Sequence, residues 1–171
     1  MPSYEYGEVE LKYDDLNASS DEVRLIIKGK GCHGAYPDGG IDAITAAAAL
    51  IQSLQTLVSR RISPFQNAVL SLGTINGGTA ANVVADRVEL EGTLRTTDSQ
   101  TRRMAKDYIR QMTENICRAY GGEGEAIFTP GYDALINTNE IVDLVGETVC
   151  QSLGKEHIHF KPFPSLGVED F

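Results

Sequence analysis

The chain has 171 residues, of which 42% are hydrophobic and 23% charged, and its formal net charge is −9. These values are typical of one globular domain, or of one domain with part of another, that can bury an apolar core. The acidic balance repels phosphate groups, so we expect neither a nucleic acid nor a membrane as a partner.

Three features of the sequence bear on its cellular location. No apolar run approaches the roughly 20 residues that cross a bilayer, and residues 1–15 lack the basic and apolar regions of a signal peptide. The cysteines Cys32, Cys117 and Cys150 are far apart and have no metal-binding spacing. We therefore expect free thiols, a cytoplasmic location and no metal bound by this stretch of chain.

The N-terminal residues show little periodicity, and we expect a short strand within residues 4–11 and a linker over residues 14–21. The first clear strand covers residues 22–28, which are rich in β-branched side chains. A loop of residues 29–40 follows, with five glycines and one proline around a single imidazole, that of His33.

A helix is expected over residues 41–60, where apolar side chains recur at three- and four-residue steps. Four consecutive alanines, residues 46–49, allow this helix to approach a sheet closely, and Pro64 prevents its continuation. The expected buried face consists of Ile41, Ile44, Ala48, Ile51, Leu54 and Val58, widened by Leu50 and Leu57.

Three more strands and one more helix follow in the predicted order. Residues 87–95 alternate between apolar and polar side chains, as in a strand with one solvated face. Asp98 or Ser99 is expected to cap the second helix, and Gly121 to end it. The expected strands are residues 68–75, 87–95 and 125–128.

The order of elements is β-α-β-β-α-β, which predicts an α+β, ferredoxin-like fold with two helices on one face of a four-stranded antiparallel sheet. We expect this unit to span residues 21–131. Residues 132–171 contain an expected helix, capped by Thr138 or Asn139, and a short strand at 157–160, and we interpret them as the start of another domain. The expected apolar side of this helix consists of Ile141, Leu144, Val145, Thr148, Val149 and Leu153.

Three polar residues near strand ends are candidates for a binding site. His33 follows the first strand, Asn82 lies in a loop of small residues, and Arg95 ends the third strand. An imidazole N–H can donate to a developing oxyanion, and a guanidinium can bind a carboxylate with two hydrogen bonds. The same residues also fit a loop histidine, a turn asparagine and a solvent-facing arginine, and their spacing leaves both interpretations open.

A second candidate is the pair His157 and His159. The two lie two residues apart in an expected strand, so they face the same side. No third or fourth ligand is apparent nearby in the sequence, and a zinc ion needs four filled positions. This pattern favours ordinary surface histidines.

Four segments, in this order along the chain, resemble motifs of the metal-dependent N-acyl-amino-acid amidohydrolases. That family includes hippurate hydrolase and indole-acetyl-amino-acid hydrolase, and is related to aminoacylase and glutamate carboxypeptidase. The segments are 29–37 (GKGCHGAYP) with 40–44 (GIDAI), 77–86 (GGTAANVVAD), 91–96 (EGTLRT) and 164–171 (PSLGVEDF).

The resemblance implies a two-domain enzyme, in which a ferredoxin-like lid is inserted into a catalytic domain that holds two divalent metal ions such as Zn, Mn or Co. Residues 21–131 would be the lid, and residues 1–20 and 132–171 would be parts of the catalytic domain. The family's metal-binding motifs are absent from these 171 residues. The chain alone is therefore expected to be inactive and to bind no metal.

The resemblance also implies roles for the site residues. The lid histidine that matches His33 reaches the active site, often that of the partner subunit, and stabilises the tetrahedral intermediate. The positions that match Asn82 and Arg95 bind the carbonyl and the α-carboxylate of an N-acyl amino acid. Gly78 and Thr79 belong to the same substrate-binding segment as Asn82.

In such an enzyme the lid forms a homodimer, and we expect residues 41–60 and 68–75 to provide the interface, since an unpaired strand edge is a template for pairing. In a single chain, we expect the His33 side chain to be exposed and without a partner.

Two other functions fit a ferredoxin-like fold. A free-standing small-molecule-binding or regulatory module would have a complete fold that ends near Tyr132. An RNA-binding domain would need exposed aromatic side chains and a basic face, whereas Glu89 and Glu91 lie on the expected outer face of the sheet.

Overall fold

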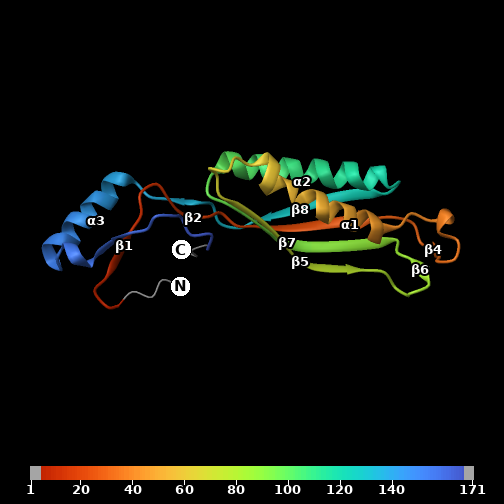
Figure 1. The fold of residues 1–171 in the computed structure, drawn as a ribbon, viewed down its shortest axis with the longest axis horizontal. Coiled ribbons are helices and arrows are strands. Elements are labelled where there is room, and N and C mark those ends of the chain that lie inside the picture. Colours follow the sequence, from red (N-terminus) through yellow and green to blue (C-terminus); the bar gives the residue numbers. More distant parts are fainter. Residues whose placement is uncertain (1–4, 168–171) are drawn as a thin grey trace.

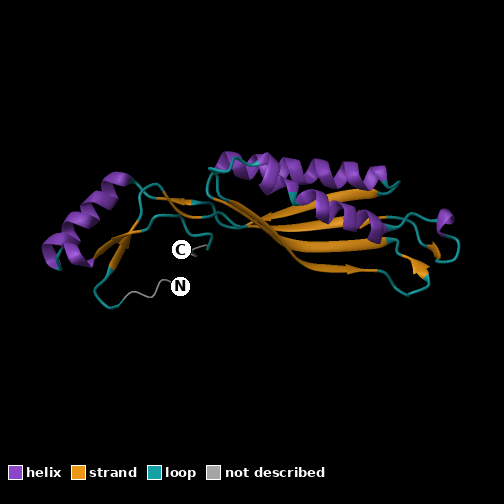
Figure 2. Ribbon diagram, viewed as in Figure 1, coloured by secondary structure: helices purple, strands orange, loops and turns teal. Residues whose placement is uncertain are grey.

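The computed structural model describes residues 5–167, which form two lobes side by side along the longest axis (Figure 1). The larger lobe is a sheet with two helices on one face (Figure 2). We call this sheet the main sheet. The smaller lobe, called the terminal lobe below, is built from the two ends of the chain.

The main sheet has four strands in the spatial order β5-β7-β3-β8, and every neighbouring pair is antiparallel. Its helices are α1 (Ala43–Leu54) and α2 (Ser99–Ala119). Each helix connects two strands that are separated by a third, which is the ferredoxin-like arrangement predicted from the sequence. The strands are β3 (Asp21–Lys28), β5 (Ala68–Gly77), β7 (Arg87–Thr96) and β8 (Glu123–Pro130).

The hydrophobic core lies between the main sheet and its two helices. Alternation along β7 places Val88, Leu90 and Leu94 in this core, as the sequence predicts. On α2, the buried residues are Thr101, Ala105, Ile109, Thr113 and Cys117. The Asp98 side chain caps α2 by accepting a hydrogen bond from the Thr101 amide at 2.7 Å, and Gly121, with φ of +85°, follows its end.

The buried face of α1 differs from the prediction. Ile44 and Val58 are 50% and 44% exposed, whereas the residues of α1 in the core are Ala43, Ala46, Ala47, Leu50 and Leu54. Small alanines allow the helix to lie close to the sheet, and this close approach turns the larger Ile44 outward. The regular helix also ends at Leu54, and a wider turn, η2 (Leu57–Arg61), buries Leu57 and exposes Val58.

The terminal lobe joins both ends of the chain. β1 (Val9–Leu11) pairs in parallel with β10 (Ile158–Phe160). β2 (Asp15–Asn17) pairs in antiparallel fashion with β9 (Leu135–Ile136), so the expected linker over residues 14–21 is wrong in part.

α3 (Asn139–Ser152) belongs to the terminal lobe, and most of its expected apolar side is not buried. Ile141, Leu144 and Leu153 are 56%, 58% and 48% exposed, while Val142 is the only buried residue of α3 in the structure. Val145, on the same side, is also 39% exposed. The expected face is therefore wrong, because Val142 is not part of it, and its apolar side chains form an exposed surface instead.

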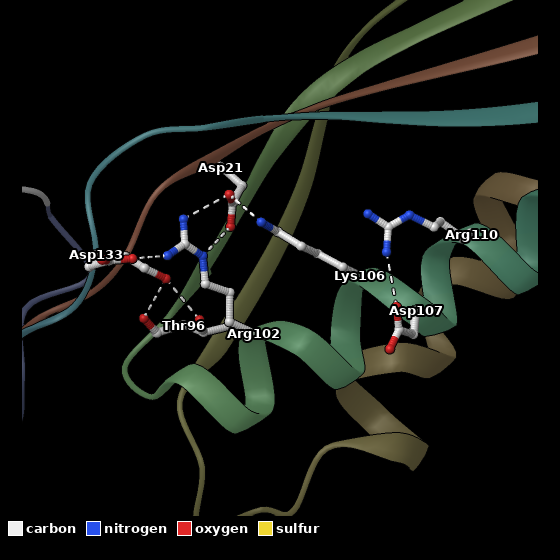
Figure 3. Close-up of polar contacts among 8 residues, drawn as sticks. Asp21, Thr96, Arg102, Lys106, Asp107, Arg110 and Asp133 are labelled. Carbon is white, nitrogen blue, oxygen red and sulfur yellow. Dashed lines mark hydrogen bonds and ion pairs between the residues drawn. The ribbon is translucent and has the colours of Figure 1, made fainter.

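A buried ionic cluster lies where the two lobes meet. The Asp21 side chain has no solvent exposure and receives two hydrogen bonds from Arg102, at 2.7 and 2.9 Å. The Lys106 ammonium lies 2.6 Å from the same carboxylate. Figure 3 shows Arg102 and Lys106 reaching from α2 to Asp21, with Arg102 also contacting Asp133. One helix thus holds both the segment that enters the main sheet and the segment that leaves it.

Candidate functional site

The loop that carries His33 lies at the end of the main sheet where β3 ends and β7 begins, which we call the distal end. Two short strands hold this loop: β4 (Cys32–His33) pairs with β6 (Val83–Val84), so that His33 lies opposite Val83. Figure 1 shows both strands beyond the end of the sheet. The main-chain N–H of Gly34 donates to the Asn82 carbonyl at 2.7 Å. The structure therefore brings His33 and Asn82 together.

The His33 side chain is exposed, as expected, but the prediction that it lacks a partner is wrong. Its Nδ1 accepts a hydrogen bond from the main-chain N–H of Ala35 at 3.1 Å. The Tyr36 ring lies beside the imidazole, with ring centroids 5.9 Å apart and a tilt of 52°. The ring is thus held by the loop that carries it, through a main-chain donor that no side-chain motif reveals.

Gly78 and Thr79 lie at the same distal end, in the exposed loop between β5 and β6. Gly78 has a φ of +77°, a conformation that glycine adopts readily and larger residues do not. A Cβ at this position would lie 3.6 Å from the Ile44 side chain of α1. The glycine pair of this motif therefore allows the chain to turn beneath α1 toward Asn82.

Arg95 lies at the opposite end of the main sheet, where β3 begins and β7 ends; we call this the proximal end. Its Nη1 donates to the Leu166 carbonyl at 3.1 Å. Arg95 also borders a hollow of about 300 Å³ beside Ser20 and Tyr132. Leu166 belongs to the segment 164–171, so the structure joins two of the motifs noted in the sequence, although residues 168–171 lie outside the described part.

His33, Asn82 and Arg95 do not gather in one chain. Arg87, at the distal end of β7, and Arg95 are eight residues apart, which is about 26 Å at a rise of roughly 3.3 Å per residue. A small substrate cannot span this distance. Any site that uses all three residues must draw on more than one copy of the chain.

His157 and His159 are not plain surface histidines, because both rings contact the Glu8 carboxylate. His157 Nδ1 lies 3.0 Å from Glu8 Oε1, and His159 Nε2 contacts Oε2. Hydrogen bonds from His159 and His157 hold the pKa of Glu8 below its ordinary value. No local pattern signals this contact, because Glu8 is about 150 residues away in the sequence and reaches the two histidines through the parallel β1–β10 pairing.

Comparison with known proteins identifies the family. Residues 17–121 match the model of the M20 peptidase dimerisation domain. Over 99% of its length the chain is 36% identical to N-acetylcysteine deacetylase and 39% identical to N-acetyl-L-cysteine deacetylase, both of Bacillus subtilis. The chain belongs to the M20 peptidase family and contains its dimerisation domain.

Solved structures give the same result. A candidate aminohydrolase from methicillin-resistant Staphylococcus aureus superimposes over 94% of the chain with a TM-score of 0.84 and 29% identity. The YXEP protein of Bacillus subtilis, a dinuclear metal binding peptidase from the M20 family, superimposes over 94% of the chain with a TM-score of 0.75 and 26% identity. The chain spans 44% and 40% of the two curated relatives, and 42% and 39% of these two structures.

Within the described part of the chain, no group of three or more His, Cys, Asp or Glu side chains is arranged to hold a metal ion. Across residues 5–167, no helix combines the length and the apolar character that crossing a bilayer requires.

Proposed function

We propose that this chain contains the lid of a metal-dependent amidohydrolase that hydrolyses the amide bond of N-acyl amino acids, and that the lid also dimerises the enzyme. In this proposal residues 21–131 form the lid, and residues 1–20 and 132–171 belong to the catalytic domain. According to their names, the two deacetylases among the relatives act on N-acetylcysteine, which supports this substrate class. The two divalent metal ions, such as Zn, Mn or Co, would be held outside the residues described, and the enzyme would be cytoplasmic.

The separation of His33 and Asn82 from Arg95 carries the proposal. β5 is an edge strand of the main sheet, so its outer side is available for pairing. In a twofold dimer that pairs two β5 edges in antiparallel fashion, the distal end of one sheet lies beside the proximal end of the other. His33 and Asn82 of one subunit would then face the region of Arg95 in its partner.

Exposed apolar side chains support this interface. Ile44 on α1 and Ile75 on β5 are 50% and 57% exposed, and both belong to the elements for which pairing is expected. Ile75 lies opposite Leu90 in the β5–β7 ladder, so it shares the helix-covered face of the sheet but extends beyond the cover of α1. Covering these side chains in a dimer removes apolar surface from water.

The chemical roles follow from the side chains. The Arg95 guanidinium would bind the substrate α-carboxylate with charge-assisted hydrogen bonds. The His33 imidazole and the Asn82 carboxamide would donate to the amide oxygen as it gains negative charge. Gly78 and Thr79 would let the Asn82 loop approach the substrate closely.

Subunit complementation in the full-length enzyme tests the proposal. His33→Ala should lower kcat by about 10²- to 10³-fold, as removal of an oxyanion donor does, whereas Arg95→Ala should mainly raise KM. Heterodimers of the two variants contain one intact site, because His33 comes from one subunit and Arg95 from the other. Mixing equal amounts should therefore restore up to about a quarter of the wild-type activity, since half of the dimers have one of two sites intact.

The control for this experiment is a mixture in which the subunits cannot exchange. Light scattering of the wild-type chain should also give the mass of a dimer. The shared site would be contradicted if the wild-type chain were a monomer at high concentration. It would also be contradicted if the mixture of the His33→Ala and Arg95→Ala variants were no more active than the two variants measured separately.

A further inference from the structure

The loop that carries His33 determines which nitrogen of the imidazole holds the proton. The Ala35 main-chain N–H points at His33 Nδ1 over 3.1 Å. An amide N–H can only donate, so Nδ1 must present its lone pair. In a neutral imidazole with an acceptor at Nδ1, the single ring proton is on Nε2.

Further hydrogen bonds close the same loop around His33. The Tyr36 amide donates to the His33 carbonyl at 2.9 Å, and the Cys32 thiol donates to the Tyr36 carbonyl at 3.3 Å. A Cβ on Gly34 would lie 3.0 Å from the Asn82 carbonyl oxygen, so the two segments are in close contact. The turn is therefore closed by hydrogen bonds at several points, and it holds the His33 backbone close to the Asn82 segment.

We infer that the Ala35 main-chain N–H is a positioning group, which selects the tautomer of His33 that carries its proton on Nε2. This inference rests on the proposed function for the nature of the acceptor, an oxygen that gains negative charge. In this tautomer Nε2–H can donate to the substrate, and neither ring nitrogen has a free lone pair, because that of Nδ1 accepts the hydrogen bond from Ala35. His33 is therefore a donor to the oxyanion rather than a general base.

The tautomer can be measured on this chain alone. In ¹⁵N spectra of histidine-labelled protein, at a pH where imidazoles are neutral, His33 should show an unprotonated Nδ1 and a protonated Nε2. The spectrum of His33→Gln identifies the His33 signals by their loss. Ala35→Pro removes the amide donor and should shift His33 toward a mixture of tautomers, while Ala35→Ser retains the donor and should leave the signals unchanged. A protonated Nδ1 in the wild type would overturn the inference.

Activity of the full-length enzyme tests the role of the donor. The amide nitrogen of glutamine can take the place of Nε2, whereas that of asparagine takes the place of Nδ1. His33→Gln should therefore retain a kcat at least about tenfold higher than His33→Asn, with similar KM values. A kcat for His33→Gln that is no higher than that for His33→Asn would overturn the donor role.

The two measurements separate the two proposals. A parent protein without amidohydrolase activity would contradict the proposed function, and the ¹⁵N signals would still decide the tautomer. Loss of activity in His33→Ala, together with a protonated Nδ1 in the wild type, would support the function and overturn the inference.

Discussion

Asp21 has no solvent exposure, yet its carboxylate lies between two cationic side chains at the junction of the two lobes. Burial raises the pKa of this carboxyl group. The hydrogen bonds and charges of Arg102 and Lys106 outweigh that effect and hold the pKa below its ordinary value. The ionised form is therefore stabilised by partners that come from a single helix.

Replacing Asp21 should destabilise the fold more than replacing its exposed neighbour Asp133, although both contact Arg102. Asp21→Asn leaves two cations without their buried partner, and we expect the free energy of unfolding to fall by about 3 kcal/mol or more. Asp133 is 90% exposed, so Asp133→Asn should cost at most about 1 kcal/mol. Denaturant titration measures both, and equal losses would contradict the importance of the buried pair.

The pKa of Asp21 gives this prediction a pH dependence. Because the pKa is lower in the folded state, the contribution of Asp21 is complete above the unfolded value of about 3.9 and is lost as the pH falls through the folded value. The difference in unfolding free energy between the wild type and Asp21→Asn should therefore shrink as the pH falls below about 4.

At the scale of elements, the β5–β7 pair explains a glycine of the EGTLRT segment. A Cβ on Gly92 would lie 1.9 Å from the Ser71 carbonyl oxygen of β5. The register of the pair shifts between Leu72 and Thr74, where Gly73 lies in an irregularity of β5. The backbone of β5 thus occupies the space that a side chain at position 92 would need.

Gly92→Ala should accordingly push β5 away from β7. The expected loss of stability is about 1 to 3 kcal/mol, as for overpacking of a close contact. Gly73→Ala is the matched control, because a Cβ there would lie 4.0 Å from its nearest neighbour, the Glu91 carbonyl oxygen. Thermal unfolding of both variants measures the two losses of stability. If Gly73→Ala lost as much stability as Gly92→Ala, the steric explanation would be refuted.

At the scale of the whole molecule, stability should differ between the two lobes. The core cluster draws its buried residues from Val23 to Cys117 and none from the terminal lobe. α1 and α3 have similar lengths, 12 and 14 residues, but α1 buries five residues and α3 one. Local opening of α3 should therefore need much less free energy.

Hydrogen exchange of this chain tests the difference. Amides in α3 should exchange about 100-fold faster or more than those in α1, which serves as the internal control. Comparable protection of the two helices would show that another surface covers the apolar side of α3.

Much of the fold was accessible from the sequence because its signals are local. Three signals depend on neighbours within a few residues: the alternation along β7, the cap at Asp98 and the order of strands and helices. Together they predicted the four-stranded sheet correctly. The inner face of α1 was missed because the close approach of a sheet, which no local period encodes, selects alanines over Ile44.

For the site, residue types in the sequence made His33, Asn82 and Arg95 candidates for holding an amide oxygen and a carboxylate. That the first two lie together and that Arg95 lies at the other end of the sheet follows from the strand pairing alone. The reason is physical: residue type sets chemistry, whereas strand register sets distance. The partner of His33 Nδ1 is a main-chain N–H, and every residue except proline carries that group.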